Sequence, residues 1–242
     1  MESGGDRMLL EYQTTTPEKV DNINKELTGK NASEVIEWGY KTYGDDLVYA
    51  CSLGAEGMVL LDLINKVQPG AKVIFLDTDF HFKQTYDLLK KVREFFPDLE
   101  IKAVKPELTV KEQAEQHGDK LWETDPDKCC ALRKLEPLEN ELAKHKAWMS
   151  GLRREQSPTR KNTQFVNIDN RFNSIKICPL IHWTWDEVWE HIKNNNLPYN
   201  ILHDQNFPSI GCFHCTSAVL DGQDSRSGRW SGSGKTECGL HK

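Results

Sequence analysis

The segment DLVYACSLGAEGMVLLDLINKV, residues 46–67, decides the fold of this chain. Its first part, Leu47–Cys51, is a short apolar run with the length and composition of a buried strand. Residues 52–57 are mostly small or polar and predict a loop, and residues 58–67 carry apolar side chains at helical spacing. A strand, a tight loop and a helix in this order are typical of a parallel sheet covered by helices.

The alternation of strands and helices continues along the chain. Residues 72–79 have the composition of a second buried strand, and residues 82–96 predict the helix that follows it. Further strands are predicted at residues 99–104, 147–154 and 175–180, and further helices at residues 17–27, 31–43 and 183–196. After Pro198 the apolar periodicity stops. The sequence therefore predicts one α/β domain over residues 1–242 with a mostly parallel, open, helix-covered sheet and a flexible C-terminal arm over about residues 217–242.

Composition limits the class of protein. The chain has 242 residues, of which 38% are hydrophobic and 28% are charged, as expected for a folded globular protein. Its 37 acidic and 31 basic residues give a net charge of −6, which argues against a general nucleic-acid binder. No apolar run reaches the length of a membrane span and no signal sequence stands at the N-terminus, so the sequence predicts a cytoplasmic protein without membrane contact.

The loop at residues 52–57 is a candidate site for an anion. Ser52 offers a hydroxyl, and Gly54 and Gly57 allow backbone amides to approach a phosphate or sulfate. The loop has neither the Walker pattern nor the dinucleotide fingerprint, so an ordinary strand-to-helix turn explains these residues equally well. The end of the second predicted strand leaves the same two options: it could contact a ligand, or Asp77 or Thr78 could cap the following helix.

The cysteines carry the strongest signal in the sequence. Seven cysteines, an odd number, indicate metal or redox chemistry in a reducing compartment rather than structural disulfides. Cys129 and Cys130 are adjacent, and Cys212 and Cys215 form a CxxC motif. Four thiolates in two groups can hold zinc or an iron–sulfur cluster, and directly adjacent ligands favour a four-iron cluster over zinc.

The remaining cysteines outside the C-terminal arm have a simpler explanation. Cys51 and Cys178 lie in apolar strands and are expected to be small core residues.

Basic residues gather at positions where a ligand is expected. Pro126 and Pro137 bracket a short predicted helix, in which Arg133 and Lys134 follow the adjacent cysteines by four residues. Two loops add the basic residues Arg153, Arg154, Arg160, Lys161, Arg226 and Arg229. In a chain that is acidic overall, arginines at loop positions favour a pocket for a phosphorylated or sulfated ligand, although solvated loops account for isolated arginines too.

Together these motifs resemble the assimilatory sulfonucleotide reductases, and within them the iron–sulfur adenylyl-sulfate (APS) reductases, which are related to the PAPS reductases. The similarity runs through CSLGAEGMVLLDL, FLDTDFHFKQTY, KCCALRKLEPL, GLRREQSPTR, GCFHCT and GRWSGSGKTECGLH. The resemblance implies an adenine-nucleotide α-hydrolase-like fold, related to the PP-loop enzymes. It also implies thioredoxin-dependent reduction of APS to sulfite and AMP through a cysteine S-sulfonate, in sulfate assimilation and cysteine biosynthesis. A similar dithiol protein could replace thioredoxin as the electron donor.

The same resemblance assigns roles to individual residues. One [4Fe–4S] cluster per chain would be held by Cys129, Cys130, Cys212 and Cys215. Cys238 would be the nucleophile. Substrate contacts would come from Ser52, Gly54, Leu76, Asp77, Thr78, Lys134, Arg153 and Arg160, and the basic pattern adds Arg133, Arg226 and Arg229. The chain departs from the family pattern at Gly57, where an acidic residue is common, and at Asp79, where glycine is common, so the choice between APS and PAPS stays open.

Other protein classes agree less well with the sequence. A PP-loop ATP pyrophosphatase should carry the motif SGGxDS after the first strand, and the loop here reads SLGAEG. A cluster-free PAPS reductase should lack both cysteine pairs. A zinc-stabilised nucleotide-binding module without catalysis is the remaining alternative. The sequence leaves the oligomeric state open, a homo-oligomer included.

Overall fold

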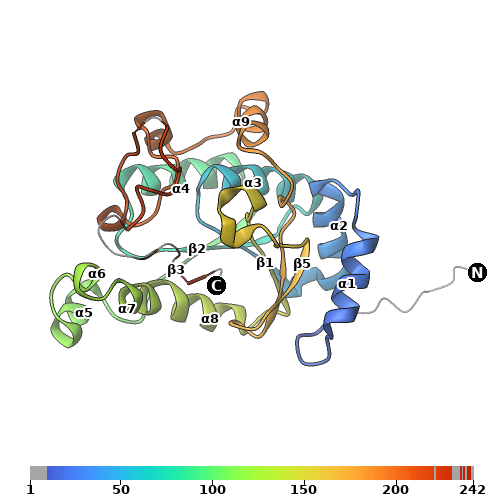
Figure 1. The fold of residues 1–242 in the computed structure, drawn as a ribbon, viewed down its shortest axis with the longest axis horizontal. Helices are drawn as coiled ribbons and strands as arrows, with labels where there is room; N and C mark the ends of the chain where they lie inside the picture. Colours follow the sequence, from blue (N-terminus) through green and yellow to red (C-terminus); the bar gives the residue numbers. More distant parts are fainter. Residues whose placement is uncertain (1–9, 221, 231–234, 236, 238, 241–242) are drawn as a thin grey trace, which may run out of the picture.

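The computed structural model describes residues 10–220, 222–230, 235, 237, 239 and 240, which Figure 1 shows in colour. In this part of the chain six strands form one sheet in the order β3-β2-β1-β4-β6-β5. The strands are β1 Leu47–Cys51, β2 Lys72–Leu76, β3 Glu100–Val104, β4 Ala147–Met149, β5 Val166–Asp169 and β6 Ser174–Ile177. Only β5 is antiparallel to its neighbour in this sheet. The predicted mostly parallel sheet is therefore confirmed.

The order of the strands creates a crevice beside β1. The chain leaves β1 through a helix to β2 and then through another helix to β3, moving away from β1 on one side. It returns to the other side of β1 as β4 and continues outward to β6 and β5. Connections that leave a central pair of strands in opposite directions open a crevice at the carboxyl ends of those strands, where α/β proteins bind ligands.

Helices cover both faces of the sheet (Figure 1). One face packs against α1 Pro17–Glu26, α2 Ala32–Tyr43, α3 Ala55–Val67, α4 Lys83–Phe95 and α9 Trp185–Asn194. The other face packs against α8 Glu136–Leu142, through Leu138 and Leu142. The chain between β3 and α8 forms α5 Val110–His117, α6 Leu121–Thr124 and α7 Pro126–Cys130. This two-sided packing matches the helix-covered sheet that the sequence predicts.

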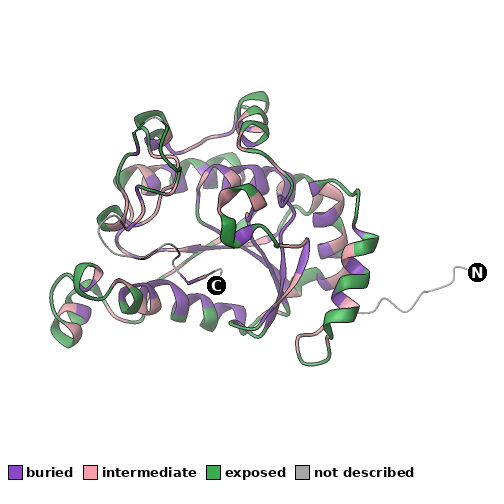
Figure 2. Ribbon diagram, in the orientation of Figure 1, coloured by how far each residue is buried: buried purple, intermediate pink, exposed green. Residues whose placement is uncertain are grey.

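The helix α3 lies inside the molecule, because it packs against the sheet and against the helices α2 and α9. Figure 2 shows the buried residues of this region in purple. Asp62 of α3 is buried too, and its Oδ2 lies 2.7 Å from both Lys66 Nζ and His191 Nε2. These partners offset the cost of burying the carboxylate and hold its pKa below the usual value, although burial alone would raise it.

The sequence predicts a helix that ends at Pro137, but in the structure the helical segment continues through this residue. A π-helical stretch, Ala131–Leu135, joins α7 to α8, and Pro137 stands in the first turn of α8. Proline is tolerated there because an N–H at the start of a new helical segment needs no partner within the helix. The π-helical stretch carries two of the predicted site residues, Arg133 and Lys134.

Several strands are shorter than their apolar runs. β4 ends at Met149 and β6 at Ile177, since the following residues leave the sheet for the loops around the crevice. The strand β5 was not predicted, because Val-Asn-Ile-Asp is short and half polar, as suits an edge strand. Beyond Pro198 the described residues form short 3₁₀ turns, Ile201–Gln205 and Phe213–Cys215, in agreement with the predicted loss of periodicity.

The described helices give no candidate for a membrane span, since none is both long and apolar enough.

We predict that the buried face of α3 sets the stability of the fold. Replacing the fully buried Leu60 by alanine removes apolar contacts and leaves a cavity, so Leu60→Ala should lower the free energy of unfolding by about 3 kcal/mol in a urea titration. Leu220→Ala is the matched control, because the side chain of Leu220 is 73% exposed and should contribute little. Equal losses in the two variants would contradict this description of the core.

Candidate functional site

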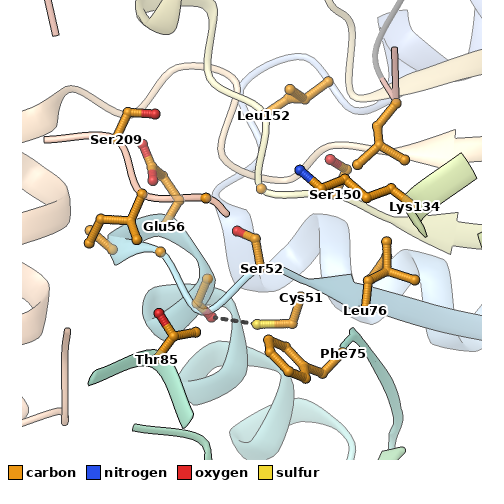
Figure 3. Close-up of a pocket in the computed structure, with 18 of the residues that line it drawn as sticks. Cys51, Ser52, Glu56, Phe75, Leu76, Thr85, Lys134, Ser150, Leu152 and Ser209 are labelled. Carbon is orange, nitrogen blue, oxygen red and sulfur yellow. Dashed lines mark hydrogen bonds between the residues drawn. The ribbon is translucent and has the colours of Figure 1, made fainter. Parts of the chain in front are cut away.

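A cavity lies at the carboxyl ends of β1, β2 and β4, in the crevice that the strand order creates (Figure 3). Of the predicted substrate contacts, it is lined by Ser52, Gly54, Leu76, Thr78, Lys134, Arg160, Arg226 and Arg229. The lining does not include Asp77, Arg133 or Arg153. Further lining residues that were not predicted are Glu56, Ser150, Gly151, Ser209, Trp230 and Leu240. The structure thus brings most of the predicted residues to one place.

The loop after β1 presents the start of α3 to this cavity. Gly54 is the N-cap of α3, and no side chain caps the first turn by a hydrogen bond. A helix N-terminus with amides that no side chain caps attracts anions. A Cβ at Gly54 would come no closer than 3.6 Å to Ser52 Oγ, whereas one at Gly57 would meet Cys51 Sγ at 3.2 Å. The loop can therefore hold a phosphate at its amides, and Gly57 lets the helix pack closely on β1.

Two carboxylates follow the end of β2. Asp77 accepts a hydrogen bond of 2.8 Å from the hydroxyl of Tyr86, and burial together with this carboxylate raises the pKa of that hydroxyl above its usual value. Asp79 has φ 59°, in the left-handed region that favours glycine. Its carboxylate is held by Lys105 at 2.6 Å and by Arg133 at 3.3 Å. The N-cap of α4 is Phe82, so neither carboxylate caps that helix.

Thr78 connects the strand end to the cysteine site. Its hydroxyl lies 3.4 Å from Cys212 Sγ and also accepts a hydrogen bond of 3.3 Å from the amide of Phe80. Thr78 is buried and lines the cavity. Thr78 therefore lines the ligand cavity and also contacts Cys212.

The four predicted metal-ligating cysteines gather in one place. Cys129 and Cys130 end α7, and Cys212 and Cys215 flank and end a 3₁₀ turn. Three of them pack in one cluster with Phe80 and Leu121. Burial, and then the charges of the other cysteines, raise the pKa of Cys129 to about 12 and that of Cys215 to about 11.

Cys212 differs from the other thiols. Burial acts to raise its pKa, but the Lys134 ammonium and the Thr78 hydroxyl outweigh burial and hold that pKa below its usual value. The four sulfurs therefore form one electrostatic unit in which Lys134 favours negative charge. Within the described residues, no three side chains of cysteine, histidine or acidic type come close enough together to hold a single metal ion.

Arg133 and Lys134 are neighbours in the chain, but their side chains contact different parts of the site. The guanidinium of Arg133 is buried, donates to the carbonyl of Thr78 at 3.2 Å and lies 4.6 Å from the centre of the Phe80 ring. It braces the turn after β2 from outside the cavity lining. Lys134 lines the cavity (Figure 3). Its ammonium also interacts with the thiol of Cys212. One lysine therefore faces both the ligand cavity and the cysteine site.

The arginines of the loop after β4 are paired with acidic side chains of the chain. Arg153 binds Glu56 at 2.9 Å and Glu155 at 2.7 Å. Arg160 donates to both carboxylate oxygens of Glu237, at 3.1 and 2.8 Å. Gln156 lies between the two pairs, because its amide donates to Glu56 at 2.9 Å and its oxygen accepts from Arg160 at 2.5 Å. The first turn of α3, the arginine loop and the C-terminal arm are thus linked in one network.

The arm supplies two more cations. Arg226 donates to Glu237 at 3.0 Å, and Arg229 donates to Ser209 Oγ at 3.1 Å. A Cβ at Gly211 would lie 2.3 Å from Nη2 of Arg229, so glycine before Cys212 leaves room for the guanidinium. The guanidinium of Arg229 also lies 4.5 Å from the centre of the Trp230 ring. These contacts hold the arginine against the wall of the cavity.

The predicted nucleophile, Cys238, lies outside the described residues. Its described neighbours in the chain are Glu237, which is bound to Arg160 and Arg226, and the pair Gly239 and Leu240. Leu240 lines the cavity and packs against the apolar cluster beneath α8. The chain is therefore fixed at the cavity on both sides of residue 238.

Sequence reasoning missed four residues that link the loops of this site. Glu56, Gln156, Lys235 and Glu237 were not assigned a role, although they link the loops that carry the predicted residues. The available signal was Glu237, the one acidic residue in the segment KTECGLHK, residues 235–242.

Known proteins share both the sequence and the fold of this chain. Residues 46–218 match the family model described as phosphoadenosine phosphosulfate reductase domain. A protein of Halalkalibacterium halodurans called adenosine 5'-phosphosulfate reductase is 64% identical over 92% of this chain and 96% of its own length. A protein of Bacillus mycoides with the same name is 59% identical over 96% of this chain and 99% of its own length.

Solved structures agree with these sequence matches. The crystal structure of phosphoadenylyl-sulfate (PAPS) reductase from Candida auris, a phosphate complex, aligns with a TM-score of 0.74 and 34% identity, over 85% of this chain and 98% of that one. An FMN adenylyltransferase of Candida glabrata aligns with a TM-score of 0.57 at 16% identity, over 85% of this chain and 69% of that one, and shares the fold alone. The chain therefore belongs to the phosphoadenosine phosphosulfate reductase family.

Proposed function

We propose that this protein reduces adenosine 5'-phosphosulfate to sulfite and AMP in sulfate assimilation and cysteine biosynthesis, with electrons from thioredoxin or a similar dithiol protein. The observation that carries the proposal is the meeting of an anion-binding loop, several cations and the C-terminal arm at one cavity. Relatives that are 57–64% identical over nearly the whole chain bear the name of this activity. Residues 1–242 would act as one domain in the cytoplasm.

The cavity offers two places for negative charge. The amides at the start of α3 would bind the phosphate of the nucleotide, with the hydroxyl of Ser52 beside them. Lys134, Arg226 and Arg229 would face the sulfate group, since all three line the same cavity. This division leaves Arg160 bound to Glu237, where it fixes the arm rather than the substrate.

The four cysteines have the donor chemistry for one [4Fe–4S] cluster. Thiolate ligands spread around a group of several iron atoms, so they need not converge as the ligands of a single ion do. The π-helical stretch supports this cofactor, because it brings Lys134 to the same thiols. When bound, the cluster would supply negative charge at fixed sulfurs and hold the two cysteine segments together.

The first chemical step would be an attack by the Cys238 thiolate on the sulfur of the sulfate group. The S–O bond to the phosphate breaks as the new S–S bond forms, so AMP leaves and Cys238 carries a sulfonate. Lys134 and the arginines of the arm would stabilise the charge that develops on the phosphate oxygen. Nearby cations also favour the thiolate form of the nucleophile.

The second step would need the dithiol protein. One of its thiolates attacks Sγ of Cys238, the S–S bond to the sulfonate breaks, and sulfite leaves with the electron pair of that bond. The second thiol of the partner then resolves the mixed disulfide, so that two thiols are oxidised to a disulfide for each sulfate sulfur reduced to sulfite.

We expect Cys238→Ser to lower sulfite release by more than about 1,000-fold, because a weaker nucleophile cannot form the S-sulfonate. The visible absorbance of the cluster should stay unchanged. Wild-type protein incubated with APS and no thioredoxin should gain the mass of one sulfonate on its C-terminal peptide, as measured by mass spectrometry. An adduct on any other peptide would show that the nucleophile is misassigned. Cys178→Ser is the matched control, since Cys178 is a buried core thiol.

We expect anaerobically purified protein to be coloured, with the broad visible absorbance of thiolate-to-iron charge transfer. Replacing Cys212 or Cys215 by serine should remove that absorbance together with about four iron atoms per chain, the content of one such cluster. Colourless protein that contains zinc would overturn the proposed cofactor and favour a zinc-stabilised module instead.

We expect APS to be the better substrate. The carboxylates of Asp77 and Asp79 follow β2, and they would repel the extra phosphate of PAPS if the ribose lies over this strand end. The ratio of kcat/KM for APS to that for PAPS should be about tenfold or more. Asp79→Asn keeps a residue that tolerates the left-handed conformation, and it should reduce this ratio. A preference for PAPS in the wild type would favour the alternative, a PAPS or dual-specificity reductase.

A further inference from the structure

Lys235 joins the C-terminal arm to the helix that carries the adjacent cysteines. Its Nζ lies 2.8 Å from Oδ1 of Asp127 and donates to the carbonyl of Pro126 at 2.9 Å. Both residues belong to the first turn of α7, and the Lys235 ammonium also interacts with Cys130 at the end of α7. Lys235 and Pro126 are 109 residues apart in the chain, so this contact joins the arm to a distant part of the sequence.

The Lys235 ammonium lies between Asp127 and Cys130 of α7. The Lys235 side chain is 6% exposed, whereas that of Asp127 is 73% exposed. Water screens the exposed carboxylate, so Asp127 attracts the ammonium less strongly than a buried anion would. The face of the Trp230 ring, 5.6 Å from Nζ, adds a weak attraction. The ammonium is therefore placed to gain from further negative charge on the side of Cys130.

A cluster held by four thiolates carries such a charge, because the four negative ligands outweigh the charge of the iron–sulfide core. We propose that Lys235 is a positioning residue through which occupation of the four-cysteine site strengthens docking of the C-terminal arm. The inference rests on the proposed [4Fe–4S] cofactor and goes beyond it. It gives the cluster a role in placing the nucleophile, three residues after Lys235, that requires no transfer of electrons.

The arm has a second anchor that does not involve the cysteines. Glu237 receives hydrogen bonds from Arg160 at 3.1 and 2.8 Å and from Arg226 at 3.0 Å. This anchor has the opposite charge and lies on the arginine loop rather than on α7. Loss of the Glu237 anchor should therefore loosen the arm whether or not the cluster is present, and a Glu237 variant serves as the control for cluster-specific effects.

The test is hydrogen exchange of the C-terminal peptide that contains residues 235–240, measured by mass spectrometry on full-length protein. Wild-type protein is compared with its cluster intact and after the cluster has been removed with ferricyanide and EDTA. Removal should speed exchange of this peptide about tenfold, as expected for the loss of a charge-assisted contact. In Lys235→Met the peptide should exchange fast in both forms, and Lys235→Arg should restore the dependence on the cluster.

Glu237→Gln should speed exchange by a similar factor in both forms, so that the cluster still slows it. If the arm of Lys235→Met responds to cluster removal as the wild type does, the proposal is wrong. It is also wrong if removal speeds exchange throughout the chain, α3 and α9 included, because the cluster would then act on the whole fold. Protein without cluster absorbance overturns the proposed cofactor, whereas clustered protein with an unresponsive arm overturns only the role of Lys235.

Discussion

The position of Lys134 is the constraint on which the rest of the site depends. This lysine is buried, lines the ligand cavity and holds the pKa of Cys212 below its usual value against the effect of burial. A buried ammonium needs negative partners, and here they come from the thiol side and from any anion in the cavity. Two anionic groups that would otherwise repel each other can therefore lie on either side of one cation. The π-helical stretch Ala131–Leu135 makes this placement, since it sets the direction of Lys134 relative to the cysteines of α7.

Local signals explain which parts of the molecule were predictable. The strand β1 and the helix α3 follow from apolar periodicity, and the cavity follows from the rule that ligands bind where the strand order reverses. Proline at position 137 misled the prediction, because a helix can restart there after a π-helical stretch. The edge strand β5 has too few apolar residues to show a period. Its pairing with β6 is a tertiary interaction that no local pattern reports.

The arrangement of charges in the ligand site was also only partly predictable from the sequence. The positions of Lys134, Arg226 and Arg229 at the cavity agree with the pattern of basic residues. The role of Arg160 does not follow from that pattern, because its partner Glu237 is 77 residues away in the chain. Sequence alone shows that a loop is basic, but it cannot show which arginines are already bound to carboxylates. The arginines that are bound in this way fix the loops.

Charge rather than apolar area fixes much of the described arm. Lys235 and Glu237, two residues apart and of opposite sign, bind α7 and the arginine loop, and Leu240 adds an apolar contact. In the proposed enzyme such an arm would respond to anions, since a cluster beside α7 would add to the attraction of Lys235. A substrate anion near Arg226 would instead compete with Glu237 for the same guanidinium. The two anions would therefore act on the arm in opposite directions, and the contents of both sites would together set how firmly Lys235 and Glu237 are held.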